Sequence, residues 1–321
     1  MRKLKEILSK PINLADQMVL VGIFLAFLYW GLESFLNVFS PEEVNIYRQL
    51  FGPNVSEMWM RLIVLCLFLI FGSHVQYTIN KRKKAEQDLL DSYRKLQNAR
   101  MTTILGLAKL AEYRDEGTGT HLERIREYAK IIATELAKIP KYQNIITSDY
   151  IDDIYQSSIL HDIGKVGIPD AILLKPAKLT EEEFAVIKRH TLLGGNAIKA
   201  IEYQIEGRSF LKMGKEIAYY HHEKWDGSGY PKGLKGKDIP LSARIVALAD
   251  VYDALTTERF YKRAYTHEKS RQIIIDLRAT HFDPAIVEVF LKLEEVFNQI
   301  REEQLKVETG WNDLPARATA T

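Results

Sequence analysis

The residues of this chain best suited to chemistry are histidines and aspartates gathered in its second half. Imidazole and carboxylate groups are the ligands that borderline and hard divalent metals take, and no thiolate lies among them. There are more of these groups than a single open metal site needs, so the pattern predicts at least two metals. The six residues fall within about ninety positions and are His161, Asp162, His190, His221, His222 and Asp250.

One carboxylate in this set is suited to serve two metals. Neighbouring side chains on a helix point about 100° apart, so His161 and Asp162 can belong to one site only if it holds metals in two different directions from the helix. Asp162 can meet this requirement by bridging two ions with its two oxygens. Two metals about 4 Å apart are a common arrangement for hydrolysing phosphate esters. The residues alone therefore predict a metal phosphohydrolase.

Two further charged residues fit this chemistry. Lys165 lies one turn after His161, where its ammonium can bind a non-bridging phosphate oxygen or stabilise a leaving group. The alternative is a solvated loop lysine. Asp250 lies within the apolar run RIVALADVYDAL, where a carboxylate is costly unless it is paired or bound to a metal.

The composition is that of a folded protein. The 321 residues allow two or three structural units. With 46% hydrophobic and 27% charged residues, the chain is expected to fold rather than to be disordered. Its formal net charge of +2 argues against DNA as a partner. The single cysteine, Cys66, cannot form an internal disulfide, and we expect it to be inert within an apolar segment.

Two apolar stretches, at about 18–39 and 60–79, predict a membrane region over residues 1–80. Each approaches the roughly 20 residues that cross a bilayer, and aromatic residues lie near their ends. A cleaved signal peptide is the first alternative, but the first stretch is long and no small-residue cleavage site follows it. A buried helix of a soluble protein is the second alternative.

Charges around the two stretches indicate the orientation of this hairpin. Lysines and arginines lie at 2–10 and 81–84, outside the pair, whereas the loop between the stretches holds three glutamates and one arginine. Basic flanks stay in the cytoplasm. We therefore expect a multi-pass protein of the inner membrane whose remaining domain lies in the cytoplasm.

The segment after the apolar stretches, residues 81–100, is charged and contains no glycine or proline. Ala85, Leu89, Tyr93 and Leu96 recur at steps of three and four, which predicts a linker helix with one apolar seam. Such a seam is typical of a short parallel coiled coil, so we expect a homodimer formed through this helix. A single helix packed on the following domain is the alternative.

Residues 101–300 are predicted to form one all-α domain. Apolar residues repeat at helical spacing through most of this region, and the sequence lacks strand alternation of useful length. Glycine and proline concentrate at 164–169 and 225–240, which predicts loops there. The chemistry is therefore expected at helix ends and in two loops, and residues 301–321 are expected to be a flexible tail.

Four motifs of this domain resemble those of the HD-GYP family, a branch of the HD superfamily of metal phosphohydrolases. The resemblance covers roughly residues 100–290, and the motifs occur in the family's order and approximate spacing. They read TGTH at 118–121, HDIGKVGIPD at 161–170, HHEKWDGSGYP at 221–231 and RIVALADVYDALTTERFYKRAY at 244–265.

The resemblance implies an HD-type helical bundle that hydrolyses cyclic di-GMP, a bacterial second messenger. It also implies a site of two or three divalent metals, often iron or manganese. By position in the motifs, it assigns His161, Asp162 and Asp250 to one metal, and Asp162, His190, His221 and His222 to the other.

The resemblance assigns substrate contacts as well. Lys165 would contact the scissile phosphate, and Arg259 and Lys262 match the basic pair that grips the dinucleotide. The loop Gly229-Tyr230-Pro231, with Tyr230 at its centre, would contact substrate at the lip of the site and partner domains outside it. The alternatives are a charged helix face for the basic pair and a packing aromatic for Tyr230.

One position departs from the family pattern. Family members with a third metal carry a glutamate four residues before the histidine of the first motif, and this chain has Gly117 there. We therefore expect two metals, and mainly the linear dinucleotide as product. His121 is then in doubt as a ligand and is expected to contact substrate or to support a ligand. If three metals bind, Glu116 or Glu112 would be the missing ligand.

The expected mechanism has no covalent intermediate, because two ions can lower the pKa of a shared water and supply hydroxide for in-line attack on phosphorus. Two alternatives to a cyclic di-GMP phosphodiesterase remain. One is the same chemistry on another cyclic dinucleotide or on a guanosine polyphosphate. The other is a non-catalytic receptor for the messenger, against which the complete ligand set argues.

Overall fold

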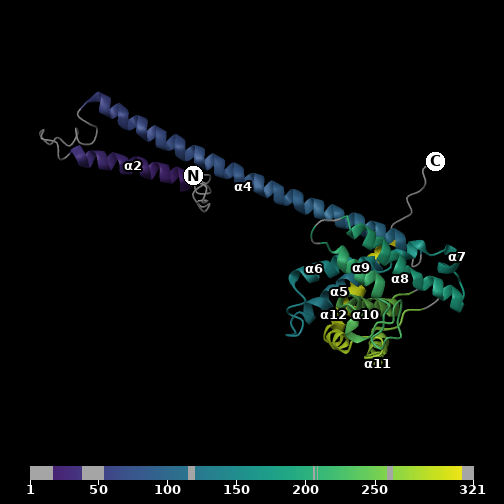
Figure 1. Ribbon diagram of the computed structural model, residues 1–321. Helices are drawn as coiled ribbons and strands as arrows, with labels where there is room; N and C mark the ends of the chain where they lie inside the picture. Colours follow the sequence, from purple (N-terminus) through teal and green to yellow (C-terminus); the bar gives the residue numbers. More distant parts are fainter. Residues whose placement is uncertain are drawn as a thin grey trace, which may run out of the picture. The chain divides into compact units, whose positions relative to one another are not determined.

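The computed structural model describes residues 17–37, 54–114, 120–204, 207, 209–258 and 263–312 (Figure 1). Within these residues it contains helices and no β-strand, apart from an isolated bridge between Arg278 and Phe282. The predicted all-α fold class is confirmed. Contacts divide the chain into two compact units, Met1–Asn98 and Ala99–Thr321.

The first unit is a pair of long apolar helices. α2 spans Gln17–Asn37, and α4 spans Val55–Glu112 and continues into the second unit. Two glycines allow α2 and the first part of α4 to pack closely. A Cβ atom on Gly22 would lie 2.8 Å from the Phe68 carbonyl oxygen, and one on Gly72 would lie 2.9 Å from that of Met18.

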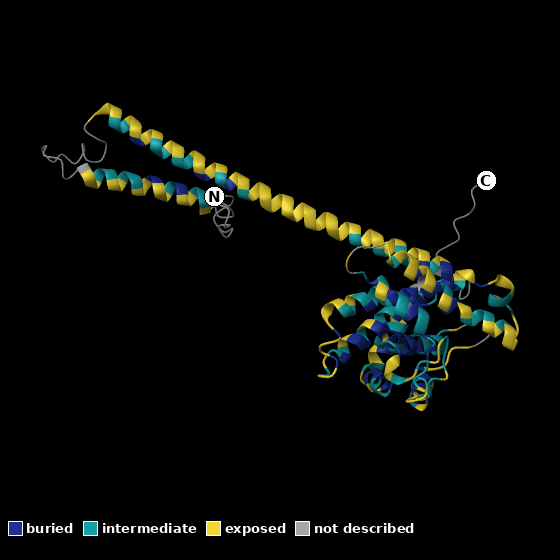
Figure 2. Cartoon of the chain, viewed as in Figure 1, coloured by how far each residue is buried: buried dark blue, intermediate teal, exposed yellow. Residues whose placement is uncertain are grey.

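The apolar parts of α2 and α4 expose apolar side chains and contain a buried ion pair. Side chains such as Phe24, Phe35 and Phe71 are exposed, and Figure 2 shows mostly exposed or partly exposed residues along both helices. Arg61 is buried, with Nε 3.3 Å from a Glu33 carboxylate oxygen. A charge in so apolar a setting needs such a partner. By length and composition, both helices are long and apolar enough to cross a membrane.

α4 is longer than either element that the sequence predicted for this region. The second apolar stretch at 60–79 and the linker helix at 81–100 were expected as successive elements, whereas a single helix includes both and ends at Glu112. The reason lies in the sequence, because no glycine or proline interrupts residues 73–105.

The second unit begins with the end of α4 and continues through short and long helices. Threonine side chains cap some of these helices, as at α8, where Thr180 and Glu183 form a capping box. The helices are α5 (His121–Leu136), α6 (Ser148–Ser157), η1 (Ser158–Leu160), η2 (Ile163–Gly167), α7 (Asp170–Leu173), α8 (Glu181–Glu202), α9 (Leu211–Tyr220), η3 (Gly236–Asp238), α10 (Leu241–Thr256), α11 (His267–Asp276) and α12 (Pro284–Asn312).

α12 also extends beyond its predicted end. A flexible tail was expected from residue 301, but the helix continues to Asn312. Residues 301–309 contain neither glycine nor proline, so the chain has no local reason to leave the helix there. The remaining part of the predicted tail, 313–321, lies outside the described residues.

The main core lies between α5, α10 and α12. Tyr128 of α5 stacks on Phe297 of α12 with ring centroids 4.4 Å apart, and Tyr252 of α10 meets both rings edge-on. A smaller apolar cluster joins the end of α4 to the rest of the unit through Ala108, which packs with residues such as Leu122. Two of these helices carry residues of interest for chemistry, His121 on α5 and Asp250 on α10.

η2 and α8 approach each other with no room for a side chain between them. A Cβ atom on Gly164 would overlap the backbone carbonyl oxygen of His190 and would lie 2.5 Å from the backbone nitrogen of Gly194. Because both obstacles are backbone atoms, neither can move aside without displacing the helix. Gly164 therefore fixes the distance between η2 and the turn of α8 that carries His190.

We expect Gly164→Ala to destabilise the domain by about 1–3 kcal/mol, as overpacking does in well-packed cores. Denaturant unfolding of the full chain measures this change. Gly106→Ala is the matched control, because its Cβ would meet nothing within 4 Å on an exposed face of α4. Equal stability of the two variants would contradict the role given to Gly164.

Candidate metal centre

The predicted ligands converge in two adjoining groups. In the first, ligand atoms of Asp162, His190, His221 and His222 all lie within 4.8 Å of one another. The His190 Nε2 atom is 3.1 Å from Asp162 Oδ1, and the His221 Nε2 atom is 3.5 Å from the same oxygen. These residues come from η2, α8 and the end of α9, which are distant in sequence.

The second group contains His121, His161 and Asp250, again with ligand atoms within 4.8 Å of one another. The Nε2 atoms of His121 and His161 lie 3.7 and 3.9 Å from Asp250 Oδ1. The His161 Nε2 atom is also 3.4 Å from Asp162 Oδ2. The two oxygens of Asp162 therefore face different groups, which is the geometry that a bridging carboxylate requires.

The backbone orients three of the imidazoles. The Nδ1 atoms of His161, His190 and His221 lie 2.7–2.9 Å from the carbonyl oxygens of Ser158, Ile187 and Ile217. A carbonyl oxygen only accepts, so each Nδ1 donates. In a neutral imidazole the Nε2 atom then carries a lone pair.

These Nε2 lone pairs face carboxylate oxygens inside the protein. The Nε2 atoms of His161, His190 and His221 are buried and make no hydrogen bond with the described residues. A lone pair and a carboxylate oxygen at such distances repel each other unless a cation lies between them or the ring is protonated. The donor set and its orientation therefore fit divalent metal ions.

The electrostatic environment favours ligand-competent forms for much of this set. Burial lowers the pKa of His221, and burial together with His221 holds the pKa of His222 well below its usual range. Burial alone would raise the pKa of Asp162, but Lys165 and His161 outweigh it and hold that pKa well below normal. Burial alone would lower the pKa of His161, but the nearby carboxylates of Asp162 and Asp250 outweigh it and raise that pKa.

His121 lies at the centre of a buried network that the sequence analysis missed. Its Nδ1 atom is 2.6 Å from Asp253 Oδ2, and Arg124 binds the same carboxylate through Nε and Nη2 at 2.6 and 2.9 Å. Burial would raise the pKa of Asp253, but Arg124 outweighs it and keeps the carboxylate ionised. The His121 Nδ1–H is thereby held on Asp253, and Nε2 is directed toward Asp250.

A sequence signal for this network exists. Arg124 follows His121 by three residues on α5, and Asp253 follows Asp250 by three on α10. Residues at this spacing share one helix face, so the two pairs could have been matched. The geometry favours a ligand role for His121 over the predicted substrate contact, because its side chain is only 1% exposed.

Lys165 and Tyr230 lie beside residues of the first ligand group. The Lys165 Nζ atom is 2.8 Å from Asp162 Oδ2. The Tyr230 ring lies 4.8 Å from that of His222, and burial raises the pKa of its hydroxyl, which therefore stays protonated. Arg259, Lys262, Glu116 and Gly117 lie outside the described residues.

Glu223 shapes the loop that presents Tyr230, a role that the sequence analysis also missed. This residue follows His222 directly and is buried. Its carboxylate accepts hydrogen bonds from the backbone N–H groups of Lys232 and Leu234 at 2.7 and 3.0 Å. A buried carboxylate with two backbone donors holds the segment 232–234 of this loop against the end of α9.

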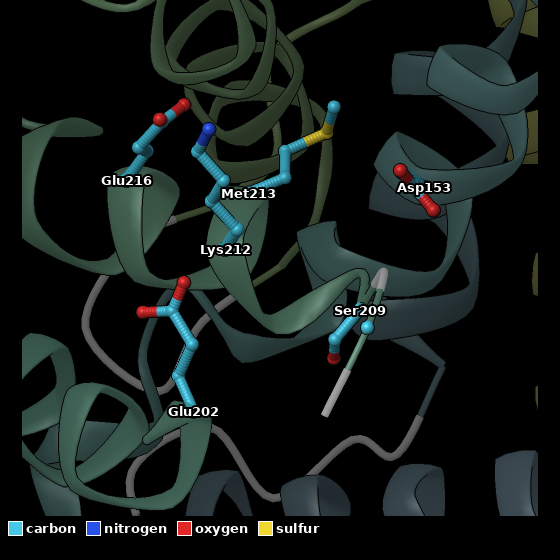
Figure 3. A pocket seen from close by; sticks show the side chains of 7 residues that line it. Asp153, Glu202, Ser209, Lys212, Met213 and Glu216 are labelled. Atoms are coloured by element: carbon cyan, nitrogen blue, oxygen red, sulfur yellow. The ribbon is translucent and has the colours of Figure 1, made fainter. Parts of the chain in front are cut away.

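A separate pocket of about 390 Å³ lies between α6, the end of α8 and α9. Figure 3 shows its polar walls, which include Asp153, Glu202, Lys212 and Glu216. None of the residues that line it belongs to the two ligand groups. It therefore adds nothing to the chemistry of the metal centre.

We expect Asp253→Asn to weaken metal binding by about 10- to 100-fold, because the group that orients a ligand imidazole is then uncharged. Metal titration of the full chain, with metal content by mass spectrometry, measures the effect. Asp152→Asn is the control, since Asp152 is exposed on α6. Unchanged metal affinity in Asp253→Asn would show that His121 needs no such support.

Comparisons with known proteins identify the family of the second unit. Residues 106–286 match the HD domain family. The chain is 52% identical over 213 residues to a cyclic di-GMP phosphodiesterase of Vibrio cholerae, covering 65% of this chain and 43% of that protein. It is 40% identical over 215 residues to a cyclic di-GMP phosphodiesterase response regulator of Xanthomonas campestris, covering 67% and 53%.

A third relative is named for a different substrate. It is a 3'3'-cGAMP-specific phosphodiesterase of Vibrio cholerae, 39% identical over 198 residues, with 62% of this chain and 35% of that protein covered. The chain spans about half the length of the curated relatives it matches. The resemblance to the HD-GYP phosphodiesterases is confirmed by these matches.

Proposed function

The chain belongs to the HD domain family, and from this premise we propose that it is a metal-dependent phosphodiesterase that hydrolyses cyclic di-GMP, mainly to the linear dinucleotide. One observation carries the proposal. The two oxygens of Asp162 face two separate groups of buried imidazoles, and Lys165 lies beside one of those oxygens. The names of the relatives support the substrate.

The described residues are suited to hold two ions. His190, His221 and His222 with Asp162 would bind one, and His161 with Asp162 and Asp250 would bind the other, with His121 as an added ligand. Iron or manganese is expected from the family resemblance. When bound, such ions supply a water of lowered pKa and neutralise charge on the phosphoryl oxygens.

The remaining residues would position the substrate. The Lys165 ammonium, held beside Asp162, would bind a non-bridging oxygen of the reacting phosphate and offset charge as it develops. Tyr230 would contact the substrate at the lip of the site. Arg259 and Lys262 are proposed to grip the dinucleotide, since guanidinium and ammonium groups suit its two phosphates.

A second candidate function has its own support. Several relatives are named as specific for 3'3'-cGAMP, so another cyclic dinucleotide is the main rival substrate. A non-catalytic receptor is less favoured, because binding alone needs no bridging carboxylate between two imidazole groups. Incubation of the metal-loaded chain with a panel of cyclic dinucleotides and guanosine polyphosphates separates the three possibilities.

We further propose that the chain is a multi-pass protein of the inner membrane with the HD domain in the cytoplasm. The apolar surfaces of α2 and the first part of α4 support this proposal. On α4, Leu89, Tyr93 and Leu96 are all more than half exposed, which supports a homodimer formed through this helix. The loop Gly229-Tyr230-Pro231 is proposed as a contact for partner domains.

Asp162→Ala is expected to abolish both metal binding and turnover of cyclic di-GMP, because one residue is asked to bridge two ions. Lys165→Ala should retain the metals and lose rate by on the order of 100-fold, as other single electrostatic stabilisers do. Lys178→Ala, an exposed lysine after α7, serves as the control. Loss of metal in Lys165→Ala would contradict the role given to this lysine.

The number of metals is a separate prediction. We expect two per domain because Gly117 supplies no carboxylate, and Gly117→Glu should raise the count toward three. The structure places another carboxylate near the ligands that could hold a third metal. Buried Glu112 has its Oε1 atom 3.3 Å from His121 Nε2. If mass spectrometry finds three metals in the unmodified chain and two in Glu112→Gln, Glu112 is the third carboxylate and the Gly117 argument fails.

A further inference from the structure

A small group of aromatic and cationic side chains lies on the outer side of the His222 ligand group. Tyr230 packs against His222, with ring centroids 4.8 Å apart. The Phe184 ring follows, 6.2 Å beyond Tyr230 and nearly perpendicular to it. The Lys188 Nζ atom lies 5.2 Å from the Phe184 centroid and 5.9 Å from that of Tyr230. We call Phe184, Lys188 and Tyr230 the rim cluster.

The rim cluster is built on the same helix turns as the ligands. Phe184 and Lys188 are one turn apart on α8, and His190 follows Lys188 by two residues. The centroids of the His190 and Tyr230 rings are 6.5 Å apart. The rim cluster therefore begins at the ligand rings themselves and extends outward along the first turns of α8.

Packing alone does not account for Phe184. Its side chain is 46% exposed, and it belongs to neither of the two apolar clusters of the domain. A phenylalanine that only filled the core would bury this surface, because burial of apolar surface stabilises a fold by about 25 cal/mol per Å². The exposed ring instead offers a π-face close to a cation, because the Lys188 ammonium lies 5.2 Å from its centroid.

An aromatic face next to an ammonium group suits one class of ligand in particular. Nucleobases stack on aromatic side chains, and their phosphates pair with lysine and arginine. In a cyclic dinucleotide, each base is joined through one sugar to the phosphates, and only one of the two phosphates can be at the metals. A base and the second phosphate must therefore lie just outside the ligand groups.

We propose that Phe184 and Lys188 form a nucleobase subsite for this substrate, in which a purine base stacks on the Phe184 ring and Lys188 binds the phosphate that is not cleaved. This inference rests on the proposed function, since it places the cyclic dinucleotide at the same metal centre. Phe184 and Lys188 bind the substrate in its ground state and transition state alike, so they act on affinity rather than on the chemical step.

Substitutions at Phe184 separate stacking from packing. Phe184→Leu keeps apolar volume and removes the π-face, whereas Phe184→Trp keeps a π-face. With the metal-loaded full chain, we expect Phe184→Leu to raise KM for cyclic di-GMP by about tenfold, as loss of one stacked base does. The kcat and the metal content should be unchanged, and Phe184→Trp should restore the low KM.

Lys188 has a matched control on its own helix. We expect Lys188→Gln to raise KM and to reduce its dependence on salt, because one phosphate contact is lost. Lys199→Gln removes a charge from an exposed position about three turns further along α8 and should change neither value. Unchanged KM in both Phe184→Leu and Lys188→Gln would overturn the inference, as would a lower kcat together with lost metal.

Equilibrium binding of cyclic di-GMP to the same variants distinguishes failure of this inference from failure of the proposed function. If the wild-type chain binds cyclic di-GMP but does not hydrolyse it, the proposed function fails, and weaker binding by Phe184→Leu and Lys188→Gln alone still supports the subsite. If the wild-type chain neither binds nor hydrolyses it, both proposals fail. If hydrolysis occurs and the variants match wild type, only the subsite fails.

Discussion

The structure of the second unit depends on one unfavourable arrangement of buried polar groups that a cation can relieve. Three buried imidazoles donate Nδ1–H to backbone carbonyls and direct Nε2 toward carboxylate oxygens. Without a positive charge between them, these atoms repel each other inside the protein, where screening by water is weak. The helices that hold them in place must therefore supply the stability that this arrangement lacks until metal binds.

The supports for this arrangement come from backbone and core rather than from the ligands. Gly164 lets η2 approach α8 at backbone distance, and Arg124 fixes Asp253 behind His121. The stacked rings of Tyr128 and Phe297 hold α5 against α12. Each support lies on an element that also carries a ligand or packs directly against one, so positioning and stability are not separable here.

Much of this site was predictable from sequence because its motifs are local. His161-Asp162 and His221-His222 are adjacent pairs at helix ends, and Asp250 is an acidic residue in an apolar run. Asp253 was missed because its spacing from Asp250 was not matched with the spacing of Arg124 from His121. Glu223 was missed because its role depends on the conformation of the loop that follows it. The continuity of α4 was missed for another reason. The composition changes from apolar to charged near residue 80, but such a change does not end a helix.

If the chain hydrolyses a cyclic dinucleotide as proposed, the metal ligands alone would not decide which one is cleaved. Metal ions held by these ligands, together with Lys165, would recognise a phosphodiester, and that group is the same in every cyclic dinucleotide. One relative named for cyclic di-GMP is 52% identical to this chain over the matched region, and one named for 3'3'-cGAMP is 39% identical. Guanine and adenine differ in the hydrogen-bonding groups at their edges, whereas both present a π-face. Stacking on Phe184 would therefore give affinity for either base, and the choice between them must rest on polar groups that meet the base edge.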